Sequence, residues 1–173
     1  MVLLAGFTAL WGQEIRLPAN LEKLAEKAEE SVTVTLDSNM LRLIARFDRD
    51  GEARKALEGV DKVYVRSFQF AFEDEYKTSD VEPLRAQLQA PTWSRIVGVR
   101  SKRFNGDGDV DVYFKDGGNG KLAGIVILVA EPRELTLVSI TGSLAPEQLA
   151  ELGGQFHIPR LDMGGAGGRR RDR

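Results

Sequence analysis

The sequence predicts an α+β fold, an antiparallel meander sheet of about four to six strands with helices packed on it. Apolar residues recur with helical spacing in the first half of the chain, as at Leu21, Leu24 and Ala28. Runs rich in β-branched and aromatic residues dominate the second half, and short turns join the last four of them. Strands joined by short turns pair antiparallel, and the helices then cover the sheet.

Five helical segments are predicted, and two of them have recognisable beginnings. Ser38 can cap the second segment, whose apolar residues fall at i, i+3, i+4 and i+7. Ser79 and Glu82 form a capping-box pattern at the start of the fourth, and Pro91 marks its end. The apolar residues of the second segment are Met40, Leu43, Ile44 and Phe47. The segments span residues 21–30, 38–47, 52–57, 79–90 and 144–152.

Six strands are predicted, and two of them have informative patterns. The segment 122–130 is continuously apolar, as expected of a central strand covered on both faces. We expect the N-terminal helices or another subunit to close its second face. Val110 and Val112 alternate with Asp109 and Asp111, which predicts a strand with one wet face. The strands span residues 32–36, 60–72, 96–102, 109–115, 122–130 and 135–141.

Composition indicates one domain with two unusual ends. The chain has 173 residues, a net charge of −2 and no cysteine, so disulfides and thiolate metal sites are excluded. Residues 160–173 carry five arginines and two aspartates, which leaves an acidic body. We therefore predict a single domain at 14–159 and a disordered Gly/Arg-rich tail at 160–173.

The segment 1–13 has no charged residue and includes an apolar run at 2–11. Ten residues are too few to cross a bilayer, which needs about 20. The run matches the apolar part of a secretory signal, although the usual positive residues before it are missing. We therefore expect export, to the periplasm or out of the cell. The alternative is an apolar helix packed on the body.

Four motifs together resemble a known family. They are YVRSFQF at 64–70, WSRIVGVRSK at 93–102, VAEPRELTLVSITG at 129–142 and LAELGGQF at 149–156. In order and spacing they resemble the bacterial domain-of-unknown-function family 4252, over about 17–159. The resemblance implies an exported envelope protein, often with a lipoprotein signal, and no known catalytic residue. Phe7 stands where a lipid-attachment cysteine would follow Leu4-Ala5-Gly6. No lipid anchor is therefore expected.

Metal binding is weakly supported. Asn105, Asp107, Asp109 and Asp111 alternate oxygen ligands, and so do Asp48, Asp50 and Glu52. A calcium loop requires a glycine at its sixth position, where Val110 stands in the first of these segments. A hairpin turn that leads into a wet strand explains the first acidic group better. No metal or cofactor is predicted.

The sequence also contains no recognisable catalytic motif. His157 is the only histidine, and no serine lies in a nucleophile elbow. Glu131 and Glu134 could act as an acid–base pair if one were desolvated, but a solvated hairpin corner explains them more simply. No catalytic residue is predicted.

Basic and aromatic residues share two of the predicted strands, an arrangement that can bind single-stranded nucleic acid. One face of the first of these strands carries an apolar row with Arg66 at its edge, however, which is more typical of core or of an interface. The row consists of Tyr64, Arg66, Phe68, Phe70 and Phe72. The tail Arg169–Arg171 is explained as a solubilising end. No nucleic-acid partner is therefore expected. The basic residues are Arg66, Arg95, Arg100, Lys102 and Arg103.

These patterns favour a non-enzymatic exported envelope protein that binds a protein partner, either another protein or a second copy of itself. One alternative is an accessory regulator of envelope signalling. The other is a small hydrolase whose site only the fold would assemble. A deep pocket holding His157 or the Glu131 and Glu134 pair would favour the hydrolase, whereas an exposed apolar patch would favour binding.

Overall fold

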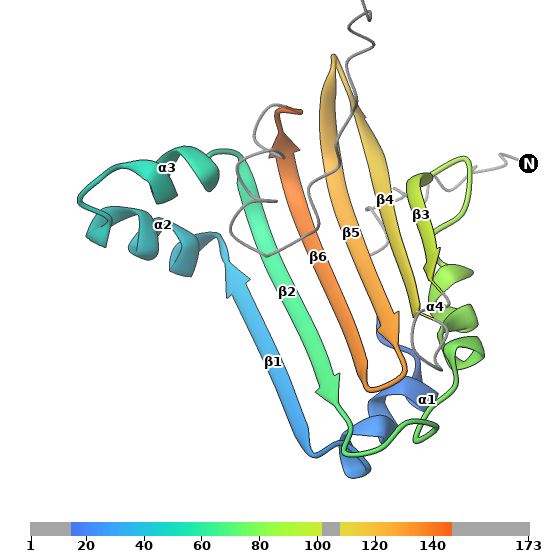
Figure 1. The fold of residues 1–173 in the computed structure, drawn as a ribbon. Helices are drawn as coiled ribbons and strands as arrows, with labels where there is room; N and C mark the ends of the chain where they lie inside the picture. The colour runs from blue at the N-terminus through green and yellow to red at the C-terminus, as the bar shows by residue number, and fades with distance from the viewer. Residues whose placement is uncertain (1–14, 102–107, 147–173) are drawn as a thin grey trace, which may run out of the picture.

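A computed structural model describes residues 15–101 and 108–146, and one open antiparallel sheet forms its centre (Figure 1). Six strands within those residues lie in the order β1-β2-β6-β5-β4-β3, and all neighbours are antiparallel. The predicted α+β class and antiparallel meander are therefore confirmed. The strands are β1 (Glu30–Asp37), β2 (Val60–Gln69), β3 (Ser94–Ser101), β4 (Gly108–Gly118), β5 (Lys121–Glu131) and β6 (Glu134–Leu144).

The topology explains the apolar run in β5. Strands β3 to β6 form consecutive hairpin neighbours, and β2 then joins the free side of β6, with Val65 opposite Val138. Strand β5 therefore lies inside the sheet, between β4 and β6. Its residues Val126 and Leu128 are fully buried from one side, while Ile125 and Ile127 are buried from the other. The prediction of a central strand covered on both faces is confirmed.

The first face of the sheet is covered by short helical elements. They are α1 (Ala19–Glu22), the 3-10 turns η1 (Lys23–Glu26) and η2 (Thr78–Val81), and α4 (Glu82–Arg85). Leu21, Leu84 and Trp93 pack there against Phe68 and Leu128 of the sheet. In Figure 1, α1 and α4 lie at the lower end of the sheet, α1 next to the β5–β6 turn and α4 beside β4 and below β3. This packing forms the larger of the two apolar clusters among the described residues.

The second face carries the other cluster, built on Val63, Val112, Ile127 and Val138. Helices α2 (Ser38–Phe47) and α3 (Glu52–Ala56) contribute Leu41 and Ala56 to it. Figure 1 shows α2 and α3 projecting beyond the end of β1 and the start of β2. The expected cover by N-terminal helices is thus divided, because α1 packs on the first face and α2 and α3 on the second. Closure by another subunit stays a prediction.

Several predicted boundaries were wrong. The segment 21–30 divides into α1 and η1, and α4 ends at Arg85 rather than near 90. Strand β6 runs to Leu144, where a helix was expected to begin. The predicted pairing of Ser79 with Glu82 does not form, because the Asp80 carboxylate accepts the Lys77 N–H at 3.0 Å instead. The segments 1–13 and 160–173, and most of the predicted final helix, lie outside the described residues.

Two glycines allow β2 and β6 to approach closely at one end. Gly59 has φ +74° and Gly142 has φ +153°, backbone angles that side chains disfavour. The Ser143 N–H donates to the Gly59 carbonyl at 2.7 Å. A Cβ atom on Gly142 would lie 2.1 Å from the Gly59 carbonyl oxygen. No side chain fits at this position without movement of the backbone.

We therefore expect Gly142→Ala to lower the free energy of unfolding by roughly 1–3 kcal/mol, the cost of backbone strain of this kind. Gly118→Ala is the matched control, because Gly118 has φ +76° but no atom within 4 Å of an added Cβ. Urea denaturation of both variants measures the difference. An equal loss in the two would contradict a close approach at Gly142.

Candidate functional site

Helix α2 presents a row of large apolar side chains to solvent. We name this row the apolar stripe; its residues are Met40 (50% exposed), Leu43 (51%), Ile44 (42%) and Phe47 (78%). The sequence pattern placed these residues on one face correctly, but that face points away from the body. Leu41 is the one buried residue of the helix. The stripe is therefore an exposed apolar patch, as at protein interaction sites.

The local sequence holds α2 in this orientation. The Asp37 carboxylate accepts the N–H groups of Asn39 and Met40, both at 2.9 Å, and so caps the helix. The cap predicted at Ser38 was therefore wrong by one residue. The Ser38 hydroxyl instead donates to the Asp61 carbonyl at 2.9 Å, which ties the first turn to the start of β2. The helix is thus anchored at its beginning and projects toward Phe47.

Two arginines lie on one side of the apolar stripe, and Arg46 is the nearer. At 100° per residue, Arg46 lies about 60° round the helix from Leu43, at one edge of the stripe, and Arg42 lies farther round on the same side. Both are exposed, and α2 itself contains no acidic residue. The Arg42 guanidinium donates to the Asn39 side chain, which aligns it along the helix surface. The docking surface is therefore apolar with a cationic border.

The aspartates of β4 lie in a buried charge cluster, defined here as Arg85, Asp109 and Asp111. Arg85 donates from Nε to Asp111 and from Nη2 to Asp109, each at 2.9 Å. The three side chains are only 4–11% exposed. The expectation that this strand has a wet face was therefore wrong, because α4 lies over it and supplies the counter-charge.

Hydrogen bonds and nearby carboxylates favour the charged form of Arg85 despite its burial. Burial by itself lowers the pKa of Arg85, but hydrogen bonds to Glu82 and Asp109 and the attraction of Asp111 together raise it above its usual value. Arg85 also donates to Glu82 at 2.6 Å within α4. The cluster joins α4 to β4, and its hydrogen-bonding groups are directed at one another. This arrangement indicates a structural role.

Three arginines predicted as a basic row are engaged within the chain. Arg95 contacts Asp111 at 3.3 Å and Arg100 contacts Asp109 at 3.5 Å, both at the exposed edge of the buried charge cluster. Arg66 lies 4.4 Å above the Phe68 ring and donates to Ser31 at 2.9 Å. Lys102 and Arg103 lie outside the described residues. Of the predicted aromatic row, Phe68 and Phe70 are core, whereas Tyr64 is only partly buried and Phe72 is 72% exposed.

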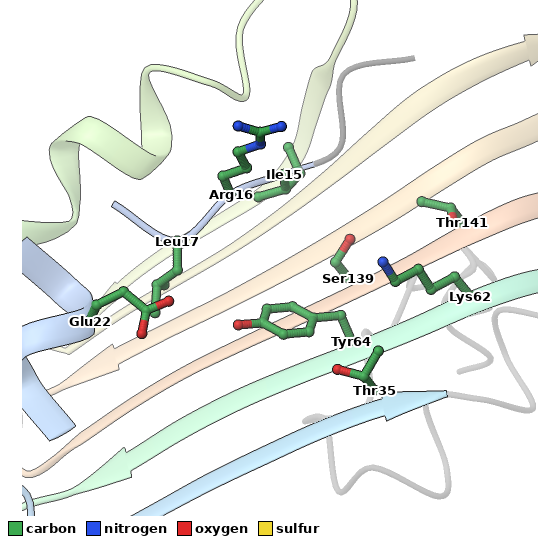
Figure 2. Close-up of a pocket in the computed structure, with 9 residues that line it drawn as sticks. All are labelled: Ile15, Arg16, Leu17, Glu22, Thr35, Lys62, Tyr64, Ser139 and Thr141. Atoms are coloured by element: carbon green, nitrogen blue, oxygen red, sulfur yellow. The ribbon is translucent and has the colours of Figure 1, made fainter. Parts of the chain in front are cut away.

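A hollow of about 390 Å³ opens on the part of the first face that α1 leaves uncovered (Figure 2). We name it the polar basin. Its floor is made of Lys62 and Tyr64 from β2, Thr35 from β1, and Ser139 and Thr141 from β6. Glu22 of α1 and the segment Ile15, Arg16 and Leu17 form its walls. Burial and the nearby Glu22 raise the pKa of Tyr64, so its hydroxyl stays protonated.

Tyr76 contacts the backbone of Glu131 and Glu134 at the β5–β6 turn. The Tyr76 hydroxyl donates to the backbone carbonyls of Glu131 and Glu134, the latter at 2.9 Å. Burial is the main cause that raises the pKa of Tyr76, and the negative charges of Glu131 and Glu134 raise it further. Neither glutamate lines the polar basin. Glu75 directly precedes Tyr76 in the chain. One of its carboxylate oxygens is buried and has no hydrogen-bond partner among the described residues.

The acidic groups considered for metal binding have other roles where they are described. Asp48 accepts the Ala53 N–H at 2.8 Å and so supports the start of α3. Asn105, Asp107, His157 and Arg169–Arg171 lie outside the described residues. Within 15–101 and 108–146, no group of three or more potential ligands gathers around a common point. No helix in these ranges is long and apolar enough to cross a membrane.

Comparison with known proteins identifies the family. A family model described as Domain of unknown function (DUF4252) matches residues 25–152. The chain belongs to this family. The match covers all six strands and includes α2 and the buried charge cluster, so these are parts of the DUF4252 domain itself. No curated protein matches the chain.

Sequence reasoning missed two features of this DUF4252 protein. Arg85 is 24 residues from Asp109 along the chain, and no local pattern links them. The polar basin collects residues from α1, β1, β2 and β6, which only the sheet order brings together. A usable signal existed in β2, where polar Lys62, Tyr64 and Arg66 precede Phe68 on the same face.

Proposed function

We propose that this protein is a non-enzymatic envelope module that binds a protein partner through the apolar stripe. The observation that carries the proposal is the exposure of four large apolar side chains, 42–78% each, on one helix. Their spacing of i, i+3, i+4 and i+7 is the pattern of a helix that docks into an apolar groove. Export is part of the proposal and rests on the apolar segment 2–11.

The cationic border specifies the partner further. Arg46 borders the stripe on one side, with Arg42 farther round on that side, and like charges across an interface are unfavourable. The partner is therefore a protein with an apolar groove and an acidic rim. The polar basin contains neither Glu131 nor Glu134, so the hydrolase alternative gains no support from them.

Site-specific photocrosslinking in the native host tests the stripe. A photoreactive amino acid at Phe47 or Ile44 is expected to give one discrete adduct, because these side chains would enter the partner's groove. Lys27 is the control position, since it is also exposed but follows η1 on the first face. Mass spectrometry identifies the adduct. Equal adducts from Lys27 and Phe47 would contradict the proposal, and an adduct with a second copy would replace it with self-association.

Phe47→Asp is expected to weaken binding of the purified partner at least tenfold, since a charge would enter an apolar groove. The variant should unfold within about 0.5 kcal/mol of the parent protein, because Phe47 is 78% exposed. Arg46→Glu should weaken binding too and make it less sensitive to salt. Calorimetry measures both variants. Unchanged affinity in Phe47→Asp would place the interface elsewhere.

A further inference from the structure

The polar basin has a floor of hydroxyl groups that the protein itself leaves unused. Thr35 lies opposite Tyr64, and Tyr64 lies opposite Ser139, so one row crosses β1, β2 and β6. Thr141 lies opposite Lys62 in the next row. Ser139 is only 8% exposed, yet neither it nor the other three hydroxyls hydrogen-bonds to another described residue. Such groups are donors and acceptors for a bound molecule.

Opposite charges stand at the two ends of the basin, along the direction of β2 (Figure 2). Figure 2 shows the Glu22 carboxylate at one end, near the Tyr64 hydroxyl, and the Lys62 ammonium group at the other, directed to the same space as Ser139. An ammonium group has three N–H donors, so Lys62 can hold a ligand as well as another partner. A carboxylate accepts from a cation, and an ammonium group donates to an anion.

We propose that the polar basin binds the two charged ends of a short peptide, two or three residues long. The free amino terminus would lie at Glu22 and the carboxylate at Lys62, with Tyr64 and Ser139 contacting the peptide groups between them. An extended tripeptide spans at most about 10 Å. A volume of about 390 Å³ lies within the range of small-molecule sites. The basin is on the first face and the apolar stripe on α2, so this site is independent of the proposed docking surface.

Trialanine and two modified forms test the charges separately. Acetylation removes the ammonium charge and amidation removes the carboxylate. NMR titration of the full chain is expected to show saturable binding of trialanine, with shifts at Tyr64, Ser139 and Thr141. Each modified form should bind about two- to fivefold more weakly, as for ion pairs near a surface.

Two variants assign each charge to its partner. Glu22→Gln should weaken trialanine binding to the level of acetyl-trialanine and remove the difference between these two ligands. Lys62→Met should do the same for the amidated form. Glu26→Gln is the matched control, since Glu26 is exposed on η1 but does not line the basin. It should bind all three ligands as the parent protein does.

Several results would overturn the site. They are no saturable binding of trialanine, equal affinity for the three forms, or the same loss in Glu26→Gln as in Glu22→Gln. Tighter binding of N-acetylglucosamine than of trialanine would assign the basin to a sugar instead. Circular dichroism of the variants separates each of these outcomes from a failure to fold.

Discussion

Replacing Arg85 with methionine is expected to lower the free energy of unfolding by about 3–5 kcal/mol. The substitution keeps an unbranched apolar stem but removes the charge that Asp109 and Asp111 face at 2.9 Å. Two carboxylates that are only 4–9% exposed would then share a buried site without their main counter-charge. Urea denaturation followed by far-ultraviolet circular dichroism measures the loss.

Arg95→Met is the matched control. Arg95 also contacts Asp111, at 3.3 Å, but its side chain is 51% exposed, so solvent screens the pair. We expect a loss below about 1 kcal/mol there. In an Arg85→Met background, Asp109→Asn together with Asp111→Asn should recover part of the stability, because no buried charge remains unpaired. A loss in Arg85→Met no larger than in Arg95→Met would show that water reaches the cluster.

The contrast between these arginines explains one error of sequence reasoning. Alternation of valine with aspartate in β4 specifies which residues share a face, and that part was correct. It does not specify what covers the face. Arg85 lies on a four-residue helix that is distant in sequence, and its charge makes burial of the aspartates favourable. A row of alternating polar residues therefore predicts a solvent-exposed strand face only where no residue of opposite charge packs against that face.

Helix α2 shows a second limit of sequence reasoning, which concerns whether an apolar face is covered. Its spacing correctly predicted a helix at 38–47 with four apolar residues on one face, but not what that face contacts. The structure buries Leu41, which lies beside that face, and leaves the stripe exposed. Periodicity detects an amphipathic face but cannot tell whether the same chain or a partner covers it. The strands were predicted better, because their apolar residues contact neighbours in a sheet whose order follows mostly from short turns.

Phe68→Ala is expected to lower the free energy of unfolding by about 3–5 kcal/mol, the usual range for a fully buried phenylalanine. Phe68 is 1% exposed and lies at the centre of the first-face core, with its ring centroid 6.5 Å from that of Phe70. The substitution opens a cavity there. It also removes the ring over which Arg66 lies at 4.4 Å, leaving a largely buried guanidinium with fewer contacts.

Phe72→Ala, three residues beyond β2, is the control. Its side chain is 72% exposed, so we expect a change within about 0.5 kcal/mol. Thermal and urea denaturation of both variants measure the contrast, and trialanine titration adds a second measure. Because Phe68 lies outside the lining of the polar basin, the folded Phe68→Ala protein should retain its ligand affinity. Similar stability losses in the two variants would mean that Phe68 does not pack in the first-face core.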